Sequence, residues 1–270
     1  MHKGERMIYR FEIKRQLMNA LVWAFVILAV FMLLVYGFYP VFLDCRPILE
    51  EYIASFPPGI AKAFGFDLDD LFGFESYSGM VYLYVSVLGA IMISSAAISV
   101  FAREKKEKCR DFLMTKPVRR GVVFGKKLLC CLTLIGIVSV PYMALYLYRA
   151  CDSREAHAVT ATMWLNAMSL PLTQLLLMSI GIFTAVFLRK VRSAAGLGMG
   201  IGMFAFLLSA VFSLTEKEGL KYVSPLYYFS PNAVAKSGGY DPACVALAAV
   251  LFLTLLIASF VKYTREDLAA

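Results

Sequence analysis

Residues 102–128 read AREKKEKCRDFLMTKPVRRGVVFGKKL and lie between two long apolar runs of the 270-residue chain. Ten of these residues are Lys or Arg. A charged side chain at the centre of a bilayer costs at least about 3 kcal/mol. The stretch therefore projects into water, and the apolar runs on either side of it are predicted to cross a membrane.

The composition supports this interpretation. The chain is 60% hydrophobic and 17% charged, with a mean hydropathy of +0.70. Soluble domains are usually about 45–50% apolar and about 25% charged. The net charge of +8 would also suit a nucleic-acid partner, but the basic residues gather at the ends of apolar runs. A membrane protein without a nucleic-acid partner is therefore expected.

The cysteines and histidines predict neither a metal site nor a disulfide framework. The chain has six Cys without a CxxC pair, and two His. Three cysteines are expected on or near the outer side, so an external disulfide stays open but would leave one of them unpaired. These three are Cys45, Cys151 and Cys244.

Six runs are long enough to span a bilayer, which takes about 20 apolar residues. We therefore predict an all-α membrane protein with a single transmembrane domain over residues 1–270. The first run is too long for the apolar part of a signal peptide and is expected to stay as a span. The predicted spans are Met18–Tyr39, Met80–Phe101, Leu128–Tyr148, Trp164–Leu188, Ala194–Leu214 and Ala243–Val261.

The distribution of Lys and Arg predicts the orientation. One set of connections carries 20 of these residues, and the other set carries seven. Because basic connections stay inside the cell, both termini are expected in the cytoplasm, as an even number of spans requires. The basic set is 1–17, 102–127, 189–193 and 262–270, and the other is 40–79, 149–163 and 215–242.

Residues 1–17 are predicted to form an interfacial helix. Arg6, Arg10 and Lys14 recur every four residues, whereas apolar Met7, Ile8, Phe11 and Met18 fall on another face. Such a helix would lie on the inner leaflet before the chain turns into the bilayer. A plain positive flank is the alternative.

Two segments are expected on the outer side. Residues 40–79 carry seven acidic residues and two basic ones, which is typical of a solvated loop. The alternative is that the acidic residues attract a cationic substrate. Residues 220–237 are aromatic and contain two prolines. That segment is too short and broken to span, so we predict re-entrant helical pieces before the sixth span, covered by protein.

The fifth and fourth spans carry unusual residues. Two GxxxG registers overlap at Gly196/Gly200 and Gly198/Gly202, which predicts close helix packing, either inside one subunit or between two. The fourth span is the most polar. Its side chains Asn166, Thr173 and Gln174 are predicted to line a path at the interface between two subunits.

The order of residues in 102–127 carries a family resemblance. An acidic residue follows the second span. After it come two large apolar residues, then Pro-Val-x-Arg, and then Gly-Lys. This order resembles the cytoplasmic loop of ABC-2 type transporter permeases, and the six spans and broken aromatic segment extend the resemblance over essentially the whole chain. The chain departs from the pattern at Lys108-Cys109, where Gly-Thr is usual. The matching residues are Glu104, Asp111, Leu113-Met114, Pro117-Val118-Arg119-Arg120 and Gly125-Lys126.

The resemblance implies a cytoplasmic coupling helix between spans 2 and 3 that docks on a separate ATP-binding-cassette ATPase. It also implies a second permease subunit, identical or different, in a prokaryotic plasma membrane. An apolar cluster with a polar rim suits such docking, and Pro117 would end the helix. The coupling residues are predicted to be Glu104, Asp111, Phe112, Leu113, Met114, Pro117 and Arg120.

The chain itself is not expected to be an enzyme or to hold a cofactor. Its only P-loop-like stretch, Gly121–Lys127, has one residue too few between its glycines and no Ser or Thr after the lysine. ATP and Mg²⁺ are therefore expected on the partner subunit.

Other functions remain as alternatives. The predicted spans contain no Asp, Glu, Lys, Arg or His, which disfavours an intramembrane enzyme and an ion-driven transporter. The absence of charged residues from the predicted spans also favours export of an amphipathic or apolar substrate over export of an ion. Such a substrate could be a drug, an antimicrobial peptide or a lipid-like molecule. A sensor or scaffold coupled to an ATPase stays open.

Overall fold

The computed structural model describes residues 2–48, 72–106, 120–153, 160–215 and 218–265. Within these ranges the chain is all-helical, and six helices are long and apolar enough to cross a membrane. The predicted fold class and the six spans are thus confirmed. The elements are α1 (His2–Met32), η1 (Leu33–Phe38), α2 (Tyr39–Asp44), α5 (Phe74–Lys106), α7 (Arg120–Ser153), α8 (Ala161–Phe187), α9 (Ala194–Thr215), α10 (Glu218–Lys221), α11 (Pro231–Ser237) and α12 (Pro242–Arg265).

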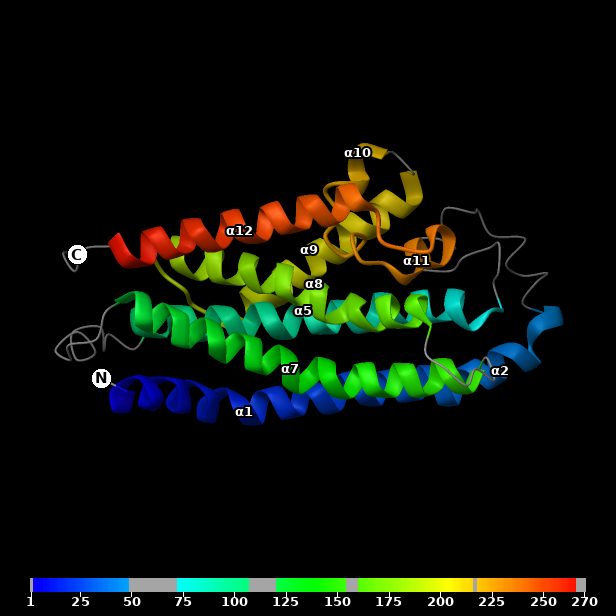
Figure 1. Ribbon diagram of the computed structural model, residues 1–270, viewed down its shortest axis with the longest axis horizontal. Helices are drawn as coiled ribbons and strands as arrows, with labels where there is room; N and C mark the ends of the chain where they lie inside the picture. Colours follow the sequence, from blue (N-terminus) through cyan, green and yellow to red (C-terminus); the bar gives the residue numbers. More distant parts are fainter. Residues whose placement is uncertain (1, 49–71, 107–119, 154–159, 216–217, 266–270) are drawn as a thin grey trace.

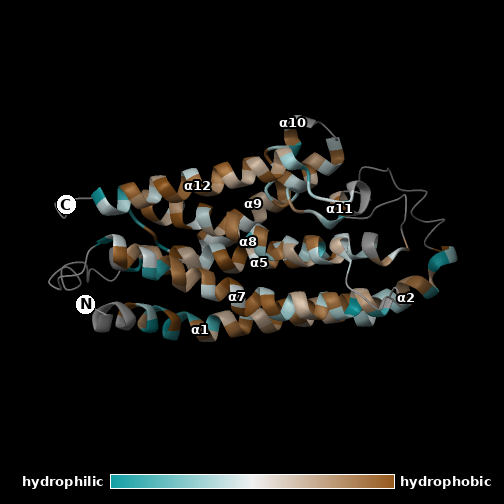
Figure 2. Ribbon diagram, viewed as in Figure 1, coloured by the Kyte–Doolittle hydropathy of each residue, from teal (hydrophilic) through white to brown (hydrophobic). Residues whose placement is uncertain are grey.

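The long helices lie along one another in an elongated bundle (Figure 1). We call the end where α1 begins and α12 ends the basic end, and the end that carries α2, α10 and α11 the aromatic end. Figure 2 shows apolar residues along the middle of the long helices and more hydrophilic residues near the two ends. This pattern is expected of helices that cross a bilayer.

The N-terminal helix is present, but it does not turn before the first span. Residues 2–32 form one continuous α-helix, which runs on through the π-helical turn η1 into α2. The hydroxyls of Tyr9 and Thr133 lie 2.9 Å apart, and Glu12 pairs with Arg103. These contacts hold the first turns of α1 against α7 and α5, so a separate interfacial helix is not what the structure shows.

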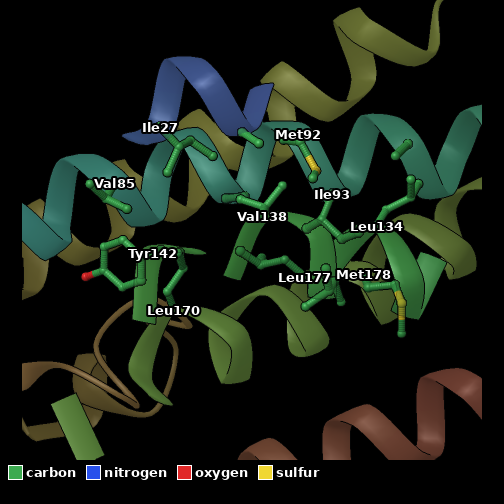
Figure 3. Packing of buried hydrophobic residues seen from close by; sticks show 14 of the residues in the cluster. Ile27, Val85, Met92, Ile93, Leu134, Val138, Tyr142, Leu170, Leu177 and Met178 are labelled. Carbon is green, nitrogen blue, oxygen red and sulfur yellow. The ribbon is translucent and has the colours of Figure 1, made fainter. Parts of the chain in front are cut away.

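Helix α5 lies at the centre of the bundle and packs on α1, α7, α8, α9 and α11. Figure 3 shows part of the core, where Val85, Met92 and Ile93 of α5 meet side chains of α1, α7 and α8. Small residues bring the backbones close: a Cβ added at Gly181 of α8 would lie 3.1 Å from the carbonyl oxygen of Ser94. Close backbone approach is the usual basis of helix association in lipid.

The segment between α9 and α12 is broken into short helices, as predicted. Helix α11 begins with Pro231 and ends at Gly238, whose φ of 73° suits glycine at a helix C-terminus. Leu226, Tyr228 and Phe229 are buried, the last two in a small cluster with α8 and α12. Protein therefore covers this segment on at least one side.

Candidate functional site at the basic end

A buried ion pair joins α1 to α5 at the basic end. Arg103 Nη1 contacts Glu12 Oε2, and the two side chains are only 11% and 6% exposed. The guanidinium also lies 5.9 Å from the centre of the Phe11 ring. A buried charge is stable only when a partner compensates the lost hydration, so each of these groups holds the other in place.

A second buried cation joins α7 to α5. Lys127 is 1% exposed, and its Nζ donates a 2.9 Å hydrogen bond to the carbonyl oxygen of Val100. The ammonium lies 5.7 Å from the Phe101 ring and 5.9 Å from the Tyr263 ring. The ring faces and the carbonyl dipole stabilise its positive charge.

The C-terminal helix joins the same assembly. Arg120 Nη1 donates a 3.3 Å hydrogen bond to the carbonyl oxygen of Thr264, which ties the start of α7 to the end of α12. Phe124 packs edge-on against both Phe260 and Tyr263 of α12. The end of α5 and the start of α7, which flank residues 107–119, are therefore fixed to α1 and α12.

The predicted coupling residues divide into two groups. Arg120 is the one whose contacts the structure describes. Glu104 lies in the last turn of α5, and nothing further is described of its side chain. The other five, Asp111, Phe112, Leu113, Met114 and Pro117, lie outside the described residues. Their part in coupling stays a prediction.

The polar residues of the fourth span lie inside the protomer, not on its outer surface. Thr173 shares a 2.6 Å hydrogen bond with Tyr82, and Ser139 donates a 2.8 Å hydrogen bond to Gln174 Oε1. Asn166 is 1% exposed, and its amide has no hydrogen-bond partner among the described residues. In this conformation these residues form a neutral polar layer between α5, α7 and α8. That they line a path between two subunits stays a prediction.

The two glycine registers face different ways. A Cβ at Gly198 would lie 2.5 Å from the backbone nitrogen of Ser95, and one at Gly202 would lie 2.5 Å from a side-chain atom of Ile91. This register packs α9 on α5 within one subunit. Gly196 and Gly200 are exposed, and a Cβ at Gly200 would meet nothing within 4 Å.

Sequence reasoning missed the buried charges of the basic end. Glu12, Arg103 and Lys127 fall just outside the predicted spans, because the helices extend beyond the apolar runs. One signal could have found the first of them. In the sequence, Glu12 and Gln16 are four residues apart and therefore share a helical face that differs from the face of Arg10 and Lys14. The structure buries Glu12 and Gln16 and leaves Arg10 and Lys14 exposed.

The described part of the aromatic end contains a more exposed ion pair, a buried tyrosine and a partly buried tyrosine. Lys221 pairs with Asp241, and this hydrogen bond lowers the pKa of the carboxyl and raises that of the ammonium. Burial raises the pKa of both Tyr228 and Tyr240 to about 12, so the two phenols stay neutral and donate to backbone carbonyls.

No site for a metal or a nucleophile stands out in the part of the chain that the structure describes. It contains no group of three or more His, Cys, Asp or Glu residues that could hold a metal ion. The five described cysteines are free thiols, and Cys109 lies outside the described residues.

Six apolar helices that are long enough to cross a bilayer define a multi-pass membrane protein. The family model described as "ABC-2 family transporter protein" matches residues 6–268, so the chain belongs to the ABC-2 transporter family. Domains of this family are membrane components that work with an ATPase subunit. No curated protein and no solved structure matches the chain.

Proposed function

We propose that this chain is the permease subunit of an ABC exporter, with the basic end and both termini in the cytoplasm. It would pair with a second permease subunit and move an amphipathic or apolar substrate with ATP hydrolysed by a separate subunit. The observation that carries the proposal is at the basic end, where buried and partly buried cations bind a carboxylate and backbone carbonyls and so fix both helices that flank residues 107–119.

A rigid attachment of this kind is what force transmission needs. The end of α5 is held by Arg103 on one side and by the contact of Lys127 with Val100 on the other. A displacement of residues 107–119 would therefore move α5 and α7 together. Because α5 packs on α1, α7, α8, α9 and α11, its movement would reach most of the bundle.

The interior supports a substrate without a strong charge. The polar groups between α5, α7 and α8 are hydroxyls and amides, such as those of Tyr82, Thr173 and Gln174. A bare ion would require charged or dense oxygen ligands at this depth. An amphipathic molecule needs only a few hydrogen-bonding groups and apolar walls.

The coupling is tested by co-purification. Candidate ATP-binding-cassette subunits from the same organism are co-expressed with the tagged chain, and the ATPase that co-purifies is quantified. Phe112→Asp and Leu113→Asp are each expected to lower its recovery at least about tenfold, since a charge would enter an apolar contact. Ile48→Asp is the matched control, because Ile48 is 61% exposed at the other end of the bundle.

Undiminished recovery with both loop variants would contradict the proposed contact. Transport is then measured separately, as ATP-dependent movement of a lipophilic dye in proteoliposomes that contain both subunits. An ATPase that binds through residues 107–119 without any movement of substrate would favour the sensor or scaffold function.

A further inference from the structure

A cavity of about 410 Å³ opens at the basic end between α1, α5 and the start of α9. Helices α1 and α9 both pack on α5 rather than extensively on one another, and the cavity occupies the space between them. This volume lies in the usual range for small-ligand sites, about 300–1,000 Å³.

The polar wall of the cavity is rich in hydrogen-bond donors. Its lining residues include Arg15, Arg103, Gln16, Asn19 and Ser99, whose side chains all carry hydrogen-bond donors. Gln16 is buried and donates a 2.9 Å hydrogen bond to Ser99 Oγ, so these two groups are already positioned. None of the lining residues is acidic, although Arg103 is paired with Glu12 behind the wall. The chemistry favours an anion with several oxygen atoms.

The rest of the wall is apolar, and the cavity lies close to the end of α5 that leads into residues 107–119. Ile98 and Val191 line it beside Ala194, the first residue of α9. Ser99 precedes the last residue of α5 by seven positions, roughly 10 Å along a helix that rises 1.5 Å per residue. The headgroup and interfacial layers add roughly 5–8 Å on each side of the hydrocarbon core, so we expect the cavity to adjoin these layers when the basic end lies at the membrane surface.

We infer that this cavity binds the phosphate group of an anionic phospholipid from the surrounding leaflet. The phosphate oxygens accept hydrogen bonds from Arg15 and Arg103, and the glycerol ester region meets Gln16 and Ser99. The exposed cations Arg189, Lys190 and Arg192, on the connection that contributes Val191, add to the attraction. The bound lipid would join α1 to α9, which otherwise meet mainly through α5.

The test uses the full-length chain in a neutral detergent, to which phosphatidylglycerol, phosphatidylcholine or inorganic phosphate is added. The shift in unfolding temperature and the lipid retained in native mass spectrometry are measured. Only phosphatidylglycerol is expected to raise the unfolding temperature and to stay bound, because a ligand that binds the folded state stabilises it.

Two variants and two matched controls locate the effect. Arg15→Gln removes a charged donor and is expected to weaken the apparent affinity for phosphatidylglycerol about tenfold. Ala194→Leu fills the cavity without changing its charge and is expected to act in the same direction. Arg10→Gln and Ala195→Leu make the same changes at exposed positions outside the cavity and are expected to leave the affinity unchanged.

Three results would overturn the inference. These are equal effects of phosphatidylcholine and phosphatidylglycerol, an equal effect of inorganic phosphate, and equal losses in the control and cavity variants. The inference does not depend on ATPase coupling, so it can fail while the proposed function stands.

Discussion

The two ends of the bundle are held together by different chemistry. At the basic end, one buried and two partly buried cations meet a carboxylate and backbone carbonyls: Lys127 with Val100, Arg103 with Glu12, and Arg120 with Thr264. Toward the aromatic end, beside the more exposed Lys221–Asp241 pair, tyrosine hydroxyls make several of the described hydrogen bonds between elements. Tyr77 donates to the carbonyl of Leu34 at 2.7 Å, Tyr82 bonds to Thr173, and Tyr240 bonds to Ser169 and the Leu165 carbonyl.

The two kinds of contact differ in how much free energy their loss costs. Losing one member of a buried ion pair leaves the other charged and without compensation, so such a pair resists gradual separation. A tyrosine hydroxyl is neutral, and the loss of its hydrogen bond costs much less. We therefore expect the basic end to resist deformation more than the aromatic end does.

The largest expected effect comes from breaking the ion pair. Arg103→Leu is expected to destabilise the folded chain by about 3–5 kcal/mol, because it leaves Glu12 buried and charged. Glu12→Leu is expected to have a similar effect, and the double variant should recover most of the loss. Unfolding in detergent measures all three. A double variant as unstable as the sum of the single variants would show that the two groups are not coupled.

Helix contacts are expected to show the next largest contrast. Gly198→Ala should cost about 1–3 kcal/mol, since its Cβ would meet the backbone of Ser95. Gly79→Ala, toward the aromatic end, should cost less, because its Cβ meets the Asn232 side chain, which can rotate. Gly200→Ala is the control and should be near neutral. The same unfolding assay ranks the three, and equal losses at Gly198 and Gly200 would contradict the packing.

A smaller effect is expected from the tyrosine contacts. Tyr82→Phe should cost about 1 kcal/mol, because Thr173 loses its partner but can bond to its own helix. Tyr84→Phe, on the exposed side of the same helix, should change the unfolding free energy by less than about 0.5 kcal/mol. A loss of 3 kcal/mol or more, as is typical on breaking a buried ion pair, would remove the distinction between the two ends.

The smallest effect concerns pH. The pKa of Asp241 is lowered below its ordinary value of 3.8 by the hydrogen bond from Lys221. Such a carboxyl stabilises the fold above its unfolded pKa, and the contribution is lost as the pH falls through the lower folded value. The unfolding temperature should therefore drop less steeply below pH 4 in Asp241→Asn than in the parent. Superimposable pH profiles would exclude a contribution from this pair.

The sequence was sufficient to predict the six spans, because apolar length alone determines which runs can cross a bilayer. The helix ends could not be predicted in the same way. Helix α5 runs from Phe74 to Lys106, well beyond the predicted span Met80–Phe101, since backbone hydrogen bonding continues where apolar composition stops. The buried or largely buried charged residues Glu12, Lys127 and Arg103 lie in helical residues outside the predicted spans, so apolar composition did not predict their burial.

The site was less predictable than the fold. The amphipathic pattern of residues 1–17 predicted a helix, but its direction depends on contacts with Arg103 and Thr133, which are distant in the sequence. Asn166, Thr173 and Gln174 were recognised as unusual, yet only tertiary packing shows that they face the interior of one subunit. The choice between the two glycine registers likewise depends on the position of α5.

Hydrogen–deuterium exchange of the chain in nanodiscs, with and without its ATPase subunit, tests most directly whether the basic end receives the force. When the ATPase binds, exchange is expected to slow over residues 107–119 and the adjoining ends of α5 and α7, and to stay unchanged over residues 222–240. Protection confined to residues 222–240, or the same exchange everywhere with the ATPase bound, would contradict this expectation.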